Sequence, residues 1–105
     1  MEDSARFTPW GVPEIPTEAA IRRVMDAEGL RYERWANRPL DVYFAHSHPV
    51  HKVIYVVAGA ITFVLPKNGA SFTMKVGDRL DLPAGTIHEA VVSTLGVECF
   101  EAHYD

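Results

Sequence analysis

The sequence predicts an all-β protein, a jelly-roll barrel or sandwich of about eight short strands with one N-terminal helix. From Leu30 onward the apolar residues lose helical spacing, and runs rich in β-branched and aromatic residues alternate with turn signals. The runs span 32–35, 42–48, 53–58, 60–65, 71–76, 79–82, 88–93 and 97–104. Short strands at this spacing are typical of antiparallel sandwiches and barrels.

Glycine, proline and asparagine separate these runs. Asn68-Gly69 and Gly77-Asp78 are the clearest turns, because Gly and Asn tolerate a positive φ angle. The other separators are Asn37-Arg38-Pro39, Gly59, Pro83-Ala84-Gly85 and Leu95-Gly96. Residues 30–105 are therefore expected to form the barrel.

The residues before the barrel differ from it in composition. Prolines recur within residues 7–16, where they remove backbone donors and fix φ, so residues 1–16 are expected to form an arm. Thr17 is a candidate N-cap, and Gly29 supplies a stop signal. Between them apolar residues recur at spacings of three and four, which predicts a helix over 17–28.

Length and composition limit the classes of function. The 105 residues, 48% hydrophobic and 23% charged, have room for one domain, residues 1–105. A net charge of -4 without a basic run argues against nucleic acid or an anionic membrane as the partner. A small molecule or a second copy is expected instead. Exposed strand edges favour a homodimer.

The sequence also indicates a compartment. The single cysteine, Cys99, leaves no internal disulfide, and the acidic start lacks the features of a secretory signal. The longest apolar run, 53–64, contains Gly59 and is too short to span a bilayer. A cytoplasmic location is therefore expected.

Three histidines form the clearest candidate site. Alternate side chains of a strand point to the same side, so His46 and His48 direct two imidazoles toward a common centre. His88 follows a Pro-x-Gly turn at the head of another apolar run, where a second strand can supply a third ring nitrogen. Three convergent imidazoles suit a divalent metal ion such as Zn, Fe, Ni, Mn or Cu.

These residues also follow the spacing of two known motifs. His46, His48 and Gly59 match a Gly, His-x-His, Glu, Gly pattern. Downstream, a Gly, Pro-x-Gly, His, Asn pattern is matched by Gly77, Pro83, Gly85 and His88. With both motifs, residues 42–104 resemble the cupin superfamily of small jelly-roll barrels. The resemblance implies a pocket inside the barrel in which the histidines hold a metal ion.

Three positions depart from the cupin motifs. Leu40 stands at the leading Gly of the first motif, Lys52 at its Glu, and Val92 at the Asn of the second. The Glu is the fourth metal ligand in many cupins, so Lys52 changes the ligand set that the resemblance implies. A divalent ion about 6 Å from a charged lysine, at an effective dielectric near 20, is repelled by roughly 5 kcal/mol.

Two strand phases are open at this position. If the phase of His46 and His48 continues, Phe44 and Lys52 also face the pocket; the ungapped step from Lys52 to Gly59 favours this. A bulge at Pro49 would instead turn His51 inward and complete a four-nitrogen site. An inward Lys52 has Glu101, on the last strand, as a candidate partner, which would reduce its repulsion of a metal.

Three functions are compatible with this pattern. The first is a mononuclear metallocupin with open coordination positions, as dioxygenase- or isomerase-like chemistry requires. The second is a metal-free cupin that binds a small anionic or carbonyl-bearing ligand, with Lys52 as its charged anchor. The third is a non-catalytic sensor or storage module.

Overall fold

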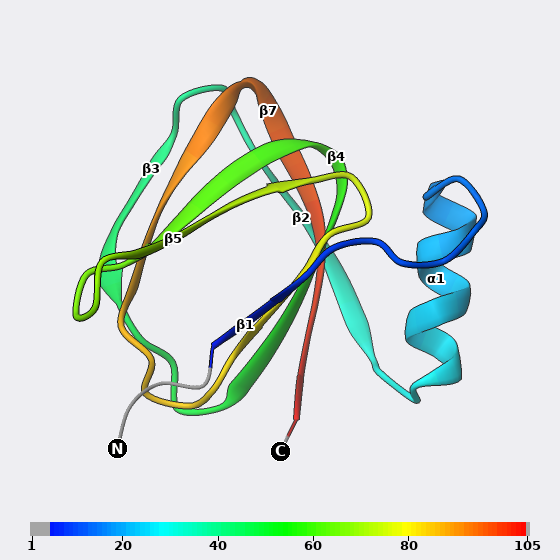
Figure 1. Ribbon diagram of the computed structural model, residues 1–105, viewed down its shortest axis with the longest axis horizontal. Coiled ribbons are helices and arrows are strands. Elements are labelled where there is room, and N and C mark those ends of the chain that lie inside the picture. The colour runs from blue at the N-terminus through cyan, green and yellow to red at the C-terminus, as the bar shows by residue number, and fades with distance from the viewer. Residues whose placement is uncertain (1–4, 105) are drawn as a thin grey trace.

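The computed structural model describes residues 5–104, which form one helix and seven strands (Figure 1). In chain order the elements are β1 (Arg6–Thr8), α1 (Glu18–Ala27), β2 (Tyr32–Asn37), β3 (Val42–His46), β4 (His51–Leu65), β5 (Ala70–Lys75), β6 (Arg79–Leu82) and β7 (His88–Tyr104). Every strand pairing is antiparallel, as expected for a jelly roll.

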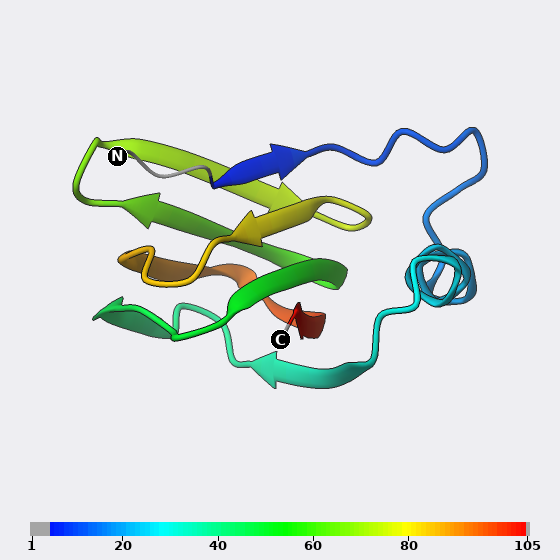
Figure 2. The ribbon, with the colours of Figure 1, turned by 90° about the horizontal axis from the view of Figure 1, so that it is seen from below.

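The two longest strands, β4 and β7, pair with each other and join the two layers of the barrel. The first part of β4 pairs with β6, and its second part pairs with β5. In the same way β7 pairs first with β3 and then with β2. Strands β1, β6, β4, β7 and β2 therefore form one layer, and β5, β4, β7 and β3 form the other (Figure 2).

The separators predicted at Gly59 and Gly96 are bends inside β4 and β7, so the eight expected strands become six, and the unpredicted β1 makes seven. Both glycines have a positive φ, +73° and +76°. The pairing of β4 with β7 shifts register beside Gly59, between Val56 and Ala58 and again before Ile61. Such bulges turn a strand while its pairing continues on either side.

The arm contains one element that the sequence did not predict. β1 pairs with β6, with Arg6 opposite Asp81 and Thr8 opposite Arg79. The strand ends before Pro9 and lies at the edge of its layer, where a neighbouring proline removes no hydrogen bond of the ladder.

The helix α1 covers the outer face of the β1-to-β2 layer and stands beside the barrel in Figures 1 and 2. Thr17 caps it, because its Oγ1 accepts a hydrogen bond from Ala20 N at 3.1 Å, and Gly29 follows with φ +74°. The cluster under the helix comprises Ile21, Met25, Leu30, Val53, Tyr55, Phe100 and Ala102. No helix in residues 5–104 is long and apolar enough to cross a membrane.

A second cluster fills the inside of the barrel. It includes Ile54, Val56, Ile61, Phe63, Leu65, Met74, Leu80, Leu82, Ala90, Val92, Val97 and Cys99. Cys99 is buried, and burial raises the pKa of its thiol. Cys99 thus packs as a small apolar side chain.

Leu40 is one of the three departures from the motif, and replacing it with glycine should stabilise the protein. Among the described residues it is the one non-glycine with a positive φ, +66°, at the position where the motif has glycine. Its side chain is 62% exposed, so its removal loses little burial. We expect Leu40→Gly to raise the free energy of unfolding by about 0.5–1 kcal/mol, because relief of Cβ strain exceeds the added chain entropy. Urea unfolding measures this.

Leu95→Gly is the matched control. Leu95 is 80% exposed and has no positive φ, so glycine should destabilise the protein there by about 0.5–1 kcal/mol. Equal effects of the two substitutions would contradict a strained backbone at Leu40.

Candidate metal centre

The structure brings together the three histidines that the motifs singled out. His46 ends β3, His48 follows in the next loop, and His88 begins β7 directly opposite His46. One ring nitrogen of each lies within 4.8 Å of those of the other two. The ring centroids are 4.3 Å apart for His46 and His88, 4.9 Å for His46 and His48, and 5.2 Å for His48 and His88.

Backbone carbonyl groups hold two of these rings in one tautomer. His46 Nδ1 lies 2.7 Å from the carbonyl oxygen of Phe44, and His88 Nδ1 lies 2.9 Å from that of Thr86. A carbonyl only accepts, so each Nδ1 carries a proton, and in the neutral ring the lone pair is on Nε2. Metal-ligating histidines are oriented in this way. The loops around the cluster are also tied together, because Gly85 N donates to the His48 carbonyl at 2.8 Å.

The surroundings of two histidines favour the neutral imidazole. Burial lowers the pKa of His48, and the positive charge of Lys52 lowers it further. Burial also lowers the pKa of His88, although its hydrogen bond to Thr86 acts in the opposite direction. Neutral imidazole is the form that binds a metal ion, so the residues present fit a divalent cation.

Lys52 faces the same pocket, and Glu101 neutralises it. Lys52 Nζ lies 2.6 Å from Glu101 Oε2, with the two side chains 19% and 25% exposed. The other carboxylate oxygen of Glu101 accepts a hydrogen bond from Trp35 Nε1 at 2.9 Å. At the position of the motif's glutamate, the pocket therefore has a lysine whose charge is balanced from β7.

His51 lies on the opposite face of β4. Its Nε2 is 2.9 Å from Asp81 Oδ1, and its ring contacts Tyr104. Asp81 also accepts from Arg79 Nε at 2.8 Å. Although burial acts to raise it, the pKa of Asp81 is lowered by Arg79 and His51. Two strand phases were open from the sequence. The structure has the one without a bulge at Pro49, in which Lys52 faces the pocket.

The strand phase predicted for β3 is wrong at one point. Phe44 was expected to face inward with the two histidines, but it is 84% exposed, and Tyr43 lines the pocket instead. The pairing of β3 with β7 shifts register between Tyr43 and His46. This irregularity places Tyr43 and His46 on the same side, although three positions separate them.

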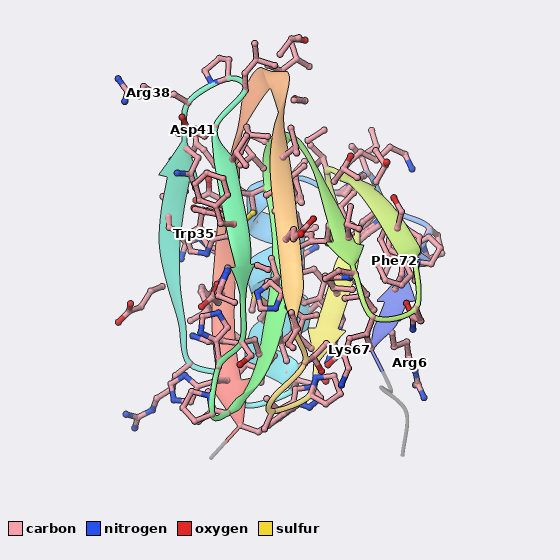
Figure 3. The ribbon with its side chains drawn as sticks, turned by 90° about the vertical axis from the view of Figure 1, so that its left-hand side faces the viewer. Arg6, Trp35, Arg38, Asp41, Lys67 and Phe72 are labelled. Atoms are coloured by element: carbon pink, nitrogen blue, oxygen red, sulfur yellow. The ribbon has the colours of Figure 1, made fainter. Side chains whose placement is uncertain are left out.

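The pocket around the histidines has a volume of about 270 Å³. Its aromatic walls were not predicted, because nothing in the sequence shows that Trp35, Tyr43 and Phe63 turn toward the histidines. Trp35, labelled on β2 in Figure 3, packs edge-on against Tyr43 with centroids 6.1 Å apart. The lining residues are Trp35, Tyr43, His46, His48, Lys52, Ile54, Phe63, Leu82, His88 and Glu101.

Comparison with known proteins places this fold among solved structures. The sequence matches no protein-family model and no curated protein. A DUF861 family protein from Thermotoga maritima is similar over 98% of this chain and 100% of its own, with a TM-score of 0.68 and 12% identity. An RmlC-like cupin from Shewanella frigidimarina matches 70% of this chain and 64% of its own, with a TM-score of 0.61 and 23% identity.

A DMSP lyase structure is also similar, with a TM-score of 0.66 and 22% identity. The match covers 72% of this chain but only 38% of the lyase chain. At these identities the comparisons establish the fold. They agree with the architecture expected from the motif residues.

Proposed function

This chain has a cupin fold, and we propose that it binds a divalent metal ion through His46, His48 and His88 and uses the ion's open positions to bind or convert a small molecule. The observation that carries the proposal is the convergence of three ring nitrogens within 4.8 Å, with His46 and His88 fixed in the ligating tautomer. Zinc, iron, nickel, manganese and copper all accept imidazole ligands, and the site does not distinguish among them.

When bound, the metal would act as a Lewis acid or redox centre. The chain's own residues would surround the bound small molecule. Trp35, Tyr43 and Phe63 give the pocket apolar walls that exclude water, and Lys52 supplies a proton donor beside the histidines. A DMSP lyase among the structural neighbours supports small-molecule chemistry on this fold. Dioxygenase- and isomerase-like reactions both fit such a site.

The test is metal content. Protein purified without added metal should carry close to one ion per chain, and added metal should raise the melting temperature of the stripped protein. Elemental analysis and thermal unfolding provide the two readings. Less than about a tenth of an ion per chain together with no stabilisation by zinc, iron or nickel would refute the proposal, since a ligand of the folded state must stabilise it.

A metal-free binding protein with Lys52 as anchor is the second candidate. The position of Lys52 on the pocket wall favours it. In that case Lys52→Ala removes ligand binding, whereas with a metal centre the same substitution preserves or tightens metal binding.

Glu101→Gln provides a sharper test of the metal site. The substitution leaves the Lys52 ammonium uncompensated inside the pocket, so we expect the affinity for Zn²⁺ to fall about ten- to a hundredfold through charge repulsion. Isothermal titration measures the affinity. The control is Glu89→Gln, the same change on β7 outside the pocket lining. Unchanged affinity in Glu101→Gln would contradict the balancing role of this carboxylate.

The homodimer remains part of the proposal. Apolar side chains are exposed on neighbouring positions of β3 and β7, where Val42 pairs with Val91 and Phe44 is 84% exposed. A contiguous apolar patch on a sheet is typical of a protein interface.

A further inference from the structure

In the Lys52–Glu101 pair, the lysine uses one of its three N–H donors. Within residues 5–104, the Lys52 ammonium donates to Glu101 alone, although it has three N–H donors. Glu101, by contrast, uses one oxygen for Lys52 and the other for Trp35. The pair therefore has unused donors and an orientation fixed from β2, and it lines the same pocket as the three histidines.

With the proposed ion bound, the charge of this pocket would favour anions. Imidazole ligands are neutral, so a divalent ion held by three histidines keeps both of its charges. Lys52 and Glu101 cancel each other, and no other charged side chain lines the pocket within the part of the chain that the structure describes. The loaded pocket thus carries two uncompensated positive charges in a partly buried site, where they attract an anion more strongly than in water.

The pocket walls limit the size and polarity of the uncharged part of the ligand. The volume of about 270 Å³ lies below the usual range for drug-sized ligands. Trp35, Tyr43 and Phe63 present rings, and Ile54 and Leu82 present aliphatic groups. A compact apolar body fits these surfaces, whereas a sugar or a nucleotide would leave its many hydroxyl groups without partners.

We propose that this pocket selects small monocarboxylic acids with an apolar body, with one carboxylate oxygen at the ion held by the three histidines and the other accepting from Lys52. The inference rests on the proposed metal site. Glu101, held by its hydrogen bond from Trp35, orients the Lys52 ammonium and competes with the incoming carboxylate for its protons. Glu101 is thus a positioning residue that sets affinity, and Lys52 is the group that recognises the ligand.

The first experiment compares acids with their neutral amides. The protein is saturated with Co²⁺, whose visible spectrum reports its ligands, and is titrated with acetate, butanoate and benzoate and with the three corresponding amides. We expect the acid to bind at least tenfold tighter than its amide in the butanoate and benzoate pairs. Equal affinities of acid and amide in every pair would overturn the inference.

Two variants distinguish direct recognition of the acid by Lys52 from attraction by the overall charge of the pocket. Glu101→Gln frees the Lys52 ammonium, so at saturating Co²⁺ it should bind the acids about tenfold tighter than the parent protein. The double variant K52Q/E101Q replaces the ion pair with two amides and should lose at least tenfold in acid affinity. A purely structural role for the pair would weaken binding in both, and that result would overturn the assignment of Lys52.

The same titration distinguishes failure of the metal site from failure of the acid site. If the Co²⁺ spectrum never departs from that of the free aqueous ion, the proposed metal function has failed. A Co²⁺ spectrum that acids do not change leaves the metal function standing and overturns the inference. Isothermal titration of stripped protein supplies the remaining outcome: acid binding that is equally tight there also overturns the inference, because the carboxylate would then need Lys52 alone.

Discussion

Replacing His88 with glutamine is expected to abolish binding of Zn²⁺ or Co²⁺ at micromolar concentrations. His88 is 3% exposed, begins β7 opposite His46, and has its Nδ1 proton directed to the Thr86 carbonyl. Loss of an outer partner of a metal ligand commonly costs ten- to a hundredfold in affinity, so loss of the ligand itself should cost about a hundredfold or more. Isothermal titration with Zn²⁺ and the Co²⁺ absorption spectrum measure the effect.

His51→Gln is the matched control, because His51 is bonded to Asp81 on the other face of β4. We expect its metal affinity to equal that of the parent protein. Since His88 is buried, His46→Gln supplies a second variant on a more exposed ligand, and circular dichroism checks that each variant folds. Equal metal binding by His88→Gln and His51→Gln would exclude His88 as a ligand.

The histidine cluster was predictable because its spacing reflects local geometry. Alternation along a strand places residues two apart on one side, and a Pro-x-Gly turn brings the next strand back. Even so, β3 ends at His46, and His48 lies in the loop beyond it. Its place is fixed by a nonlocal contact, the hydrogen bond from Gly85 N, which only the folded chain shows.

The choice between Lys52 and His51 could not be made from periodicity, and the fold explains why. In most barrels the outer face of a strand meets solvent, so polar residues mark it. Here α1 covers that face of β4, and Val53 and Tyr55 pack beneath the helix. Ile54 and Val56 fill the inside of the barrel, so β4 is apolar on both sides.

The remaining members of the site came from tertiary contacts. Trp35 reaches the pocket because β2 pairs with the end of β7, where Trp35 lies opposite Cys99. Tyr43 reaches it because a register shift in β3 interrupts the alternation. Neither event leaves a motif in the sequence. Glu101 was a candidate, but its direction depended on which neighbours β7 would acquire.

Replacing Gly59 with alanine is expected to destabilise the whole barrel. A Cβ at this position would lie 2.0 Å from the carbonyl oxygen of Gly96 and 2.8 Å from its carbonyl carbon. Both are backbone atoms, so no side-chain rotation relieves the clash. The bends of β4 and β7 must separate, although these bends join the two layers. We expect a loss of more than about 3 kcal/mol in the free energy of unfolding, the upper range for overpacking, measured by urea denaturation.

Gly69→Ala separates this clash from backbone strain. Gly69 has φ +75°, nearly the same as the +73° of Gly59, but an added Cβ there meets no atom within 4 Å. Its substitution should therefore cost only the left-handed penalty of about 1–2 kcal/mol. If the two variants lose equal stability, the positive φ alone accounts for the glycine at position 59. A larger loss in Gly59→Ala means that the close approach of β4 and β7 requires glycine there, independently of the histidine pocket.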